Sequence, residues 1–297
     1  LGDVYKRQFP MCGIVGYIGT QNATPLIVDG LARLEYRGYD SAGIAVFQDN
    51  AIQIRRDVGK LINLRNKLVG SPIAGTIGVG HTRWATHGVP AEHNAHPHVS
   101  MNGEYVVVHN GIVENYLELR EELTAEGVVF KSETDTEVIV QLISRFAADG
   151  IHSDVAEATR MAVHHLRGAH AIVVMSKHQP DRLVAVRIGN AGGVALGLGE
   201  GEMFIASDIP AILEHTRRMI FLESRQMAVI TADGYTVTDL EGQPISTVVH
   251  TIPYDPVSAE KARIATSCKK KSSSKPAVSP TPFADGLILN TKRCCCP

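Results

Sequence analysis

The feature that most constrains the fold is the segment from residue 170 to residue 240, where short apolar strand patterns follow one another with tight turns between them. Val and Ile dominate these patterns, and Gly-rich turns bound them, as is typical of strands. A doubly wound parallel fold would place a helix between successive strands. The sequence therefore favours antiparallel sheets covered by helices.

Further strand patterns lie in the first half of the chain, where amphipathic helical patterns separate some of them. Over the whole chain, strands are predicted at residues 14–19, 42–47, 52–56, 76–82, 105–109, 170–176, 183–188 and 203–206, with a hairpin-like series over 227–237. This number of strands excludes a helical bundle.

Capping residues and apolar spacing predict four helices. In the first helix, Thr24 is predicted as the N-cap and Pro25 as the first helical residue, with Gly38 just past the end. The second helix is predicted over residues 114–126 and ends at Gly127.

The third helix is predicted to begin with a capping box, Thr134-x-x-Glu137, and the fourth to begin at Ser153 and end at Gly168. An apolar stripe on the third helix predicts burial on one side only; it consists of Val138, Ile139, Leu142, Ile143 and Phe146. The helices are therefore expected to form outer layers.

Composition supports an ordinary globular protein, since 44% of the 297 residues are hydrophobic and 20% are charged. No run approaches the length of a membrane span, and no signal-peptide pattern opens the sequence, so the cytoplasm is the expected location. Residues 11–267 hold 21 Lys and Arg against 29 Asp and Glu. This acidic balance argues against a nucleic-acid partner.

The two ends of the chain differ from the rest. Residues 1–10 are interpreted as a non-native leader, and residues 267–297 as an unstructured, non-native tail that holds four of the five cysteines. Residues 11–247 are predicted to form the domain, and residues 248–266 a linker in which two prolines interrupt the pattern.

Cys12 is the first candidate for chemistry, because it directly follows Met11 at the start of a predicted strand. Removal of Met11 would give Cys12 a free α-amino group, which titrates near ~7.7–8.0 and can accept the thiol proton. Nucleophile and base would then belong to one residue. The alternative is an inert buried cysteine.

Three further polar positions interrupt the apolar patterns. Arg83 offers a planar cation suited to a carboxylate, although it could form an ordinary salt bridge. Asn110 and Gly111 could supply two donors to an oxyanion, or could simply form a turn. Asp135 could pair with a ligand ammonium, although capping alone would explain its neighbours Thr134 and Glu137.

Thirteen histidines raise the question of a metal. His93, His96 and His98 lie close together, but their spacing fits no common zinc pattern and no acidic cluster accompanies them, so no metal is expected. The sequence also lacks a phosphate-binding loop and a dinucleotide fingerprint. No cofactor is therefore expected.

Taken together, these segments resemble the class II glutamine amidotransferases, and among them the glutaminase domain of the isomerising glutamine:fructose-6-phosphate aminotransferases. The resemblance covers about residues 11–258 and rests on strings in family order: MCGIVGYIG, LEYRGYDSAGIAV, GHTRWATHG, NAHPH, VVHNGIVEN, SETDTEV, LRGAHA and FIASD. It implies an α+β fold, a four-layer αββα sandwich of two antiparallel sheets flanked by helices, of the N-terminal-nucleophile hydrolase type.

The resemblance also implies the roles of the site residues. Cys12 would be the nucleophile, Asn110 and Gly111 the oxyanion hole, Arg83 the partner of the glutamine carboxylate and Asp135 the partner of its ammonium. The remaining implied residues are Thr86 and His87 in the glutamine pocket, Trp84 in the loop that closes over it, and Arg37 near the cysteine.

The implied reaction is hydrolysis of glutamine through a Cys12 thioester, with the ammonia passed to a sugar-isomerase half that converts fructose 6-phosphate to glucosamine 6-phosphate. The matching segment stops before such a half, whose presence is also expected to support homo-oligomers. With residues 1–10 attached, the chain is expected to be inactive. The alternatives are a truncated module that binds glutamine without turnover, the glutaminase domain of another class II amidotransferase, and a generic cysteine hydrolase.

Overall fold

The computed structural model describes residues 12–35, 40–84, 88–148 and 154–253. Its described strands form two sheets, and every strand pairing among the described residues is antiparallel. The prediction of antiparallel rather than parallel sheets is therefore confirmed.

One sheet has eight strands among the described residues, and the first strand of the chain is one of its two middle strands. In spatial order the strands are β14 (His250–Thr251), β11 (Arg218–Phe221), β9 (Ala195–Leu198), β10 (Met203–Ala206), β1 (Gly13–Ile18), β4 (Ile77–Arg83), β2 (Ser41–Gln48) and β3 (Ala51–Val58). The β1–β4 register places Gly13 opposite Thr82.

The other sheet has six strands among the described residues. In spatial order they are β13 (Gly234–Asp239), β12 (Gln226–Thr231), β8 (Leu183–Ile188), β7 (His170–Ser176), β6 (Tyr105–Gly111) and β5 (His98–Val99). Asn110 and Gly111 belong to β6, where they lie opposite Ala171 and His170 of β7.

The core lies on both faces of the six-stranded sheet, because alternate residues of a strand point to opposite faces. In β6, Val106 and Val108 pack into the core shared with the eight-stranded sheet. Tyr105 and Val107 pack instead into a second core with the helices. The same alternation buries β7 and β8 on both faces.

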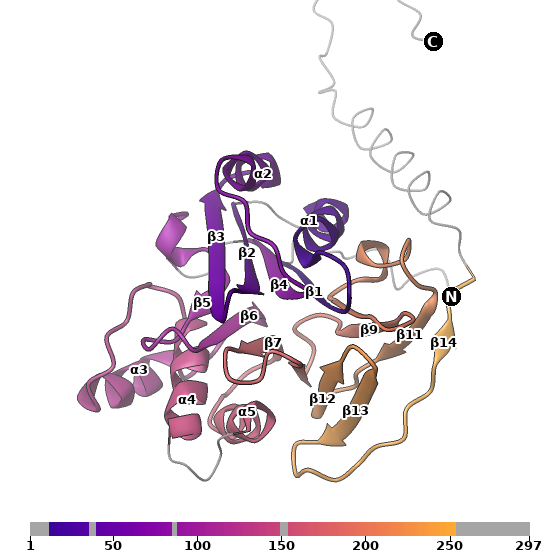
Figure 1. The fold of residues 1–297 in the computed structure, drawn as a ribbon. Helices are drawn as coiled ribbons and strands as arrows, with labels where there is room; N and C mark the ends of the chain where they lie inside the picture. The colour runs from indigo at the N-terminus through magenta and orange to yellow at the C-terminus, as the bar shows by residue number, and fades with distance from the viewer. Residues whose placement is uncertain (1–11, 36–39, 85–87, 149–153, 254–297) are drawn as a thin grey trace, which may run out of the picture. The chain divides into compact units, whose positions relative to one another are not determined.

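Helices cover the outer faces of both sheets, as Figure 1 shows. α1 (Ala23–Leu34) and α2 (Leu61–Gly70) lie against the eight-stranded sheet, and α3 (Tyr116–Ala125), α4 (Glu137–Ala148) and α5 (Val155–His164) lie on the side of the six-stranded sheet. Short 3-10 turns occur at η2 (Glu92–Asn94) and η3 (Ile209–Ala211). The predicted four-layer αββα sandwich is confirmed.

Close approach of α1 to the eight-stranded sheet depends on glycines in β4. A Cβ on Gly80 would collide with the side chain of Ile27, and one on Gly78 would lie 3.0 Å from the same side chain. Ile27 and Leu31 of α1 are fully buried over this strand. The glycines of the β4 pattern therefore let the helix backbone approach the sheet.

The predicted start of the first helix needs correction. Asn22, not Thr24, is the N-cap, because the Asn22 side chain accepts a hydrogen bond from the Thr24 N–H. The Thr24 hydroxyl instead donates to the Ile73 carbonyl oxygen at 2.7 Å. The fourth helix begins after Asp154, whose side chain accepts from two N–H groups of its first turn. Gly38 and Ser153 lie outside the described residues.

The predicted capping box of the third helix is wrong. Glu137 is itself the first residue of α4, and its carboxylate reaches backward, accepting from the Ser132 and Lys131 N–H groups at 2.6 and 2.9 Å. Thr134 contacts the side chains of Ser132 and His98. Glu137 therefore secures the loop before the helix.

The prediction that this helix is buried on one side only is also wrong. All seven residues from 137 to 143 are buried, because α3 and α5 flank α4 while its third side faces β5 and β6. α2 was not predicted, since only Leu61 and Leu64 of its ten residues are buried.

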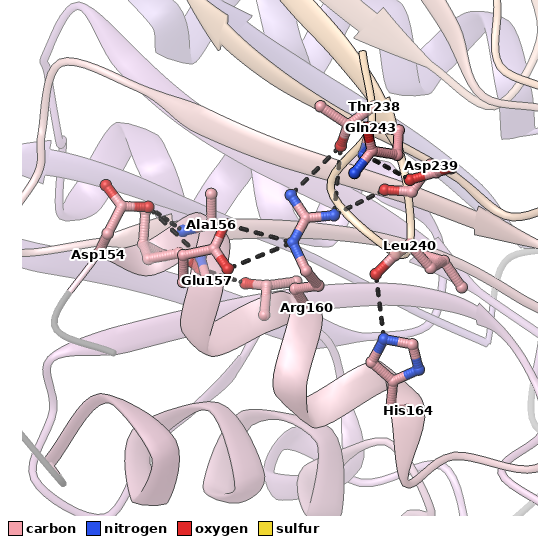
Figure 2. A network of polar contacts seen from close by, with 11 residues as sticks. Asp154, Ala156, Glu157, Arg160, His164, Thr238, Asp239, Leu240 and Gln243 are labelled. Atoms are coloured by element: carbon pink, nitrogen blue, oxygen red, sulfur yellow. Dashed lines mark hydrogen bonds and ion pairs between the residues drawn. The ribbon is translucent and has the colours of Figure 1, made fainter. Parts of the chain in front are cut away.

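A polar network fastens α5 to the end of β13 (Figure 2). The Arg160 guanidinium donates to the Asp239 carbonyl oxygen at 2.6 Å and to the Thr238 hydroxyl oxygen at 3.2 Å. Its Nε donates to Glu157 on the same helix at 3.2 Å. One turn later, His164 donates to the Leu240 carbonyl oxygen at 3.0 Å.

Two residues of the predicted linker, His250 and Thr251, form β14 at the edge of the eight-stranded sheet. They pair with Met219 and Arg218 of β11, respectively. The predicted domain boundaries themselves stay a prediction. No helix among residues 12–35, 40–84, 88–148 and 154–253 is long and apolar enough to cross a bilayer.

Candidate active site

A cavity of about 190 Å³ opens where β4 and β6 end and β1 begins. Six residues expected to carry the chemistry line it together: Cys12, Arg83, Trp84, Asn110, Gly111 and Asp135. They come from positions up to 123 residues apart in the chain, between Cys12 and Asp135. The other expected residues, Arg37, Thr86 and His87, lie outside the described residues.

Cys12 directly precedes β1, and its thiol lies against the backbone of Trp84 at the end of β4. The Trp84 N–H donates to Cys12 Sγ at 3.2 Å, and Sγ lies 3.6 Å from the Trp84 carbonyl oxygen. The Cys12 side chain is half-buried, and the Trp84 side chain is 46% exposed. The thiol is therefore accessible from the cavity, and a backbone donor can stabilise negative charge on it.

Asn110 reaches across from the other sheet. Its side-chain Nδ2 donates to the Cys12 carbonyl oxygen at 3.1 Å, which brings the amide next to the thiol-bearing residue. Because Asn110 and Gly111 are paired strand residues, the alternative that they form a simple turn is wrong.

Gly111 cannot be replaced without strain. Its φ of +136° lies in a region that residues with a Cβ rarely adopt. A Cβ there would also collide with the Ala169 carbonyl oxygen and lie 2.8 Å from His109 Nε2. The backbone conformation and the close neighbours at the cavity wall therefore require glycine next to Asn110.

Opposite charges are buried in the same cavity. Arg83 is 4% exposed and donates to the Gly88 carbonyl oxygen at 3.1 Å, while Asp135 is 3% exposed. Asp135 Oδ2 accepts from the Val113 N–H at 2.8 Å. An arginine and an aspartate in one small cavity match the two charges of an amino-acid zwitterion.

Five histidines are buried at and below the cavity: His81, His96, His98, His109 and His170. Burial lowers the pKa of His81 to about 3 and that of His170 to about 4. Burial also holds the pKa values of His96, His98 and His109 well below their ordinary value. All five are therefore neutral at pH 7.

These rings are linked to one another and to the cavity wall. His109 Nδ1 lies 2.9 Å from the Thr136 hydroxyl, and His109 Nε2 lies 3.1 Å from His170 Nδ1. His98 Nε2 lies 3.0 Å from the Thr134 hydroxyl. Among the described residues, no three His, Cys, Asp or Glu side chains are arranged to hold a metal ion.

Sequence reasoning did not place several of the cavity residues at the site: His96, His109, Ile112, Thr134, Thr136, Asn190 and Ala191. Asn190 and Ala191 lie in the loop after β8, where no local pattern distinguishes them from ordinary loop residues. His109 and Thr136 could have been found only by knowing that the β6 end meets the start of α4.

The sandwich has a cysteine directly before a central strand and a polar cavity beside it. Residues 68–262 match the model of the glutamine amidotransferase domain family. The chain therefore belongs to this family of glutamine amidotransferase domains.

Curated relatives include the isomerising glutamine–fructose-6-phosphate aminotransferases of Aquifex aeolicus and Symbiobacterium thermophilum. Each is 49% identical to this chain, over 251 and 255 residues, or 84% and 86% of it. The match covers 41% of each relative. The chain thus spans less than half the length of these relatives.

Solved structures support the fold. The glutamine phosphoribosylpyrophosphate amidotransferase of B. subtilis, complexed with ADP and GMP, superposes with a TM-score of 0.67 at 24% identity, covering 77% of this chain and 49% of that one. A glutamine aminotransferase class-II domain protein from Silicibacter pomeroyi gives 0.52 at 18% identity, covering 77% of this chain and 99% of that one. At these identities the likeness concerns the fold alone.

Proposed function

We propose that this domain, with Cys12 as its first residue, hydrolyses the side-chain amide of glutamine. The observation that carries the proposal is the convergence of a thiol, an amide donor and two opposite buried charges on one cavity. Arg83 would bind the α-carboxylate of glutamine and Asp135 its α-ammonium, which directs the side chain toward Cys12. Trp84, Thr86, His87 and Arg37 are proposed to complete the pocket.

In the proposed reaction, the α-amino group of Cys12 accepts the thiol proton, and Sγ forms a bond to the amide carbon of glutamine. The carbonyl electrons move to the oxygen, which accepts hydrogen bonds from Asn110 Nδ2 and the Gly111 N–H. The ammonium then protonates the leaving nitrogen, the C–N bond breaks, and ammonia leaves behind a thioester. The Trp84 N–H supports the thiolate form, since it points to Sγ.

Hydrolysis completes the cycle. Water adds to the thioester carbon while the α-amino group accepts its proton, the C–S bond breaks, and the sulfur regains a proton as glutamate leaves. Because the α-amine is the base, no separate histidine is required, which fits the low pKa values of the buried histidines.

We further propose that the domain is the glutaminase half of a glutamine:fructose-6-phosphate aminotransferase, since it matches 41% of such relatives at 49% identity. Ammonia would then be used by the part of the relatives beyond this chain, which would bind fructose 6-phosphate. Homo-oligomers of the full-length enzyme, a cytoplasmic location and the absence of a cofactor stay predictions.

The test is release of glutamate from glutamine by a chain that begins at Met11, with removal of Met11 verified by mass. We expect glutamate from this chain and none from its Cys12→Ala variant. A processed, folded chain that binds glutamine without releasing glutamate would overturn hydrolysis in favour of a binding module. Retention of residues 1–10 should abolish release, because the nitrogen of Cys12 is then a peptide amide.

A further inference from the structure

The Asn110 side chain is held from both ends. Its Nδ2 donates to the Cys12 carbonyl oxygen at 3.1 Å, and its Oδ1 lies 3.0 Å from His81 Nε2. His81 stands on β4 and Asn110 on β6, so this second contact joins the two sheets. Both residues continue the inward-facing positions of their strands, after Val79 and Val108 respectively.

The contacts of His81 determine which of its nitrogens carries the proton. His81 Nε2 lies 3.0 Å from two acceptors, Asn110 Oδ1 and the His109 carbonyl oxygen. A carbonyl oxygen only accepts, so Nε2 must be the protonated nitrogen. The Asn110 oxygen therefore faces His81, and the Asn110 nitrogen faces Cys12.

His96 packs against the His81 ring edge to face, with the ring centroids 4.1 Å apart. His96 Nδ1 lies 3.0 Å from His81 Nδ1 and 3.1 Å from His81 Nε2, so it contacts both nitrogens almost equally. The tautomer of His81 therefore follows from the two oxygen acceptors at Nε2 and not from His96.

We propose that His81 is a positioning residue for the oxyanion donor Asn110. Asn110 has two N–H bonds on Nδ2; the Cys12 carbonyl oxygen uses one, and the second points to a substrate oxygen. Without His81, the amide can turn and present its oxygen, which repels an oxyanion. This inference rests on the proposed glutaminase function.

The test compares His81→Met, which removes the donor, with His81→Gln, which can keep an N–H near the same place. We expect His81→Met to lower kcat about 10-fold or more, toward the ~10²–10³-fold loss typical of a missing oxyanion donor. KM should stay close to that of the parent, because Arg83 and Asp135 are untouched. His81→Gln should restore most of kcat.

A double variant separates positioning from general damage. In an Asn110→Ala background, His81→Met should lower kcat no further, since its effect passes through Asn110. Leu64→Ala, a core variant of α2 outside the cavity, serves as the control for lost stability. An equal loss in both backgrounds, a parallel rise in KM, or a parental kcat in His81→Met would overturn the inference.

Imidazole 15N spectra give a readout that does not depend on turnover. We expect His81 to carry its proton on Nε2. We also expect the Asn110 side-chain amide protons to exchange faster with solvent in His81→Met. An inactive parent would overturn the proposed function alone. An Nδ1-protonated His81, or unchanged Asn110 exchange, would overturn the positioning role even in an active parent.

Discussion

At the scale of single residues, the cavity is built where the apolar alternation of two facing strands gives way to polar side chains. Val79 is followed by His81 and Arg83 on β4, and Val108 by Asn110 on β6. The same paired strands that pack the core residues also fix the positions of the polar residues at their ends. Core packing therefore helps to preorganise the site.

Gly111→Ala should damage both the fold and the site. The positive φ and the collision with the Ala169 carbonyl oxygen together predict a loss of about 1–3 kcal/mol or more in the free energy of unfolding. Urea denaturation measures it. Gly127→Ala is the matched control, because Gly127 also has a positive φ, +94°, but has open space around its Cβ position. Equal losses for the two variants would contradict the argument from the collision.

Asp135→Asn should weaken glutamine binding while leaving the fold intact. The amide oxygen can still accept from the Val113 N–H, but the negative charge facing the α-ammonium is lost. Charge-assisted hydrogen bonds contribute about 1.5–3 kcal/mol, so we expect KM to rise about 10- to 100-fold. Steady-state glutamate release measures it.

A glutamine analogue without the α-amino group provides the control for Asp135. The parent and the Asp135→Asn variant should turn over this analogue at similar kcat/KM, since it has no ammonium to bind. A large difference between them would mean that Asp135 acts on the fold of the cavity and not on the substrate ammonium.

Six of the nine residues predicted for the site line one cavity, and the other three lie outside the described residues. The roles of these residues stay predictions, and the sequence did not reveal how the six are held. Cys12, Arg83, Asn110 and Asp135 stand out because each follows or precedes a strand or helix pattern and carries a reactive or charged group. The partner of Asn110, His81, sits 29 positions away on another sheet. No local pattern encodes a contact between two sheets.

At the scale of elements, Arg160 supplies the largest part of the polar connection between α5 and the end of β13, beside the contact of His164 with Leu240. Arg160 is 11% exposed in its side chain and donates to the Asp239 carbonyl oxygen as well as to Thr238 (Figure 2). Replacement by Ala would remove a hydrogen bond from a charged donor and leave the Asp239 carbonyl oxygen with the Gly242 N–H at 3.3 Å, so we expect a loss of about 1.5–3 kcal/mol in the free energy of unfolding.

The control for Arg160 is Arg145, which pairs with Glu122 and Glu126 across α3 and α4. These glutamates are about half exposed, and exposed ion pairs contribute about 0–1 kcal/mol. Arg145→Ala should therefore destabilise less than Arg160→Ala in urea denaturation. The reverse order would refute the view that the backbone contact, and not the ion pair, stabilises α5.

Prediction of elements succeeded where burial is strong and failed where it is slight. Strands β7 and β8 begin and end at the predicted residues, because they are buried on both faces and bounded by turn residues. The short strands β9, β11 and β14 and the helix α2 were not predicted, because few of their residues form a periodic apolar pattern. Capping failed at Glu137, since its carboxylate satisfies loop N–H groups at Lys131 and Ser132.

At the scale of the whole molecule, the layer order follows from the sequence because two sheets that are apolar on their inner faces must pack against each other. What the sequence does not disclose is that histidines occupy the polar end of this sandwich. Five are buried and neutral there, because burial lowers their pKa values. The same five side chains bind protons much more readily in the unfolded chain.

This arrangement predicts acid sensitivity of the whole domain. Burial puts the pKa of each histidine below its unfolded value of about 6.5, reaching about 4 for His170 and about 3 for His81. Below pH ~6.5 the unfolded chain binds more protons than the folded chain, so acid favours unfolding. Stability is complete above that pH and falls by ~1.4 kcal/mol per pH unit for each histidine until its folded pKa is reached.

Urea denaturation between pH 7.5 and 5.5 tests this, because few carboxylates titrate there. The free energy of unfolding should fall steeply as the pH is lowered. His170→Gln should reduce this slope by about 1.4 kcal/mol per pH unit, which corresponds to one proton. His93→Gln, which replaces an exposed histidine, should leave the slope unchanged. A flat profile in this range would mean that the buried rings can accept protons within the folded sandwich, and the neutral tautomer assigned to His81 would then lose its basis.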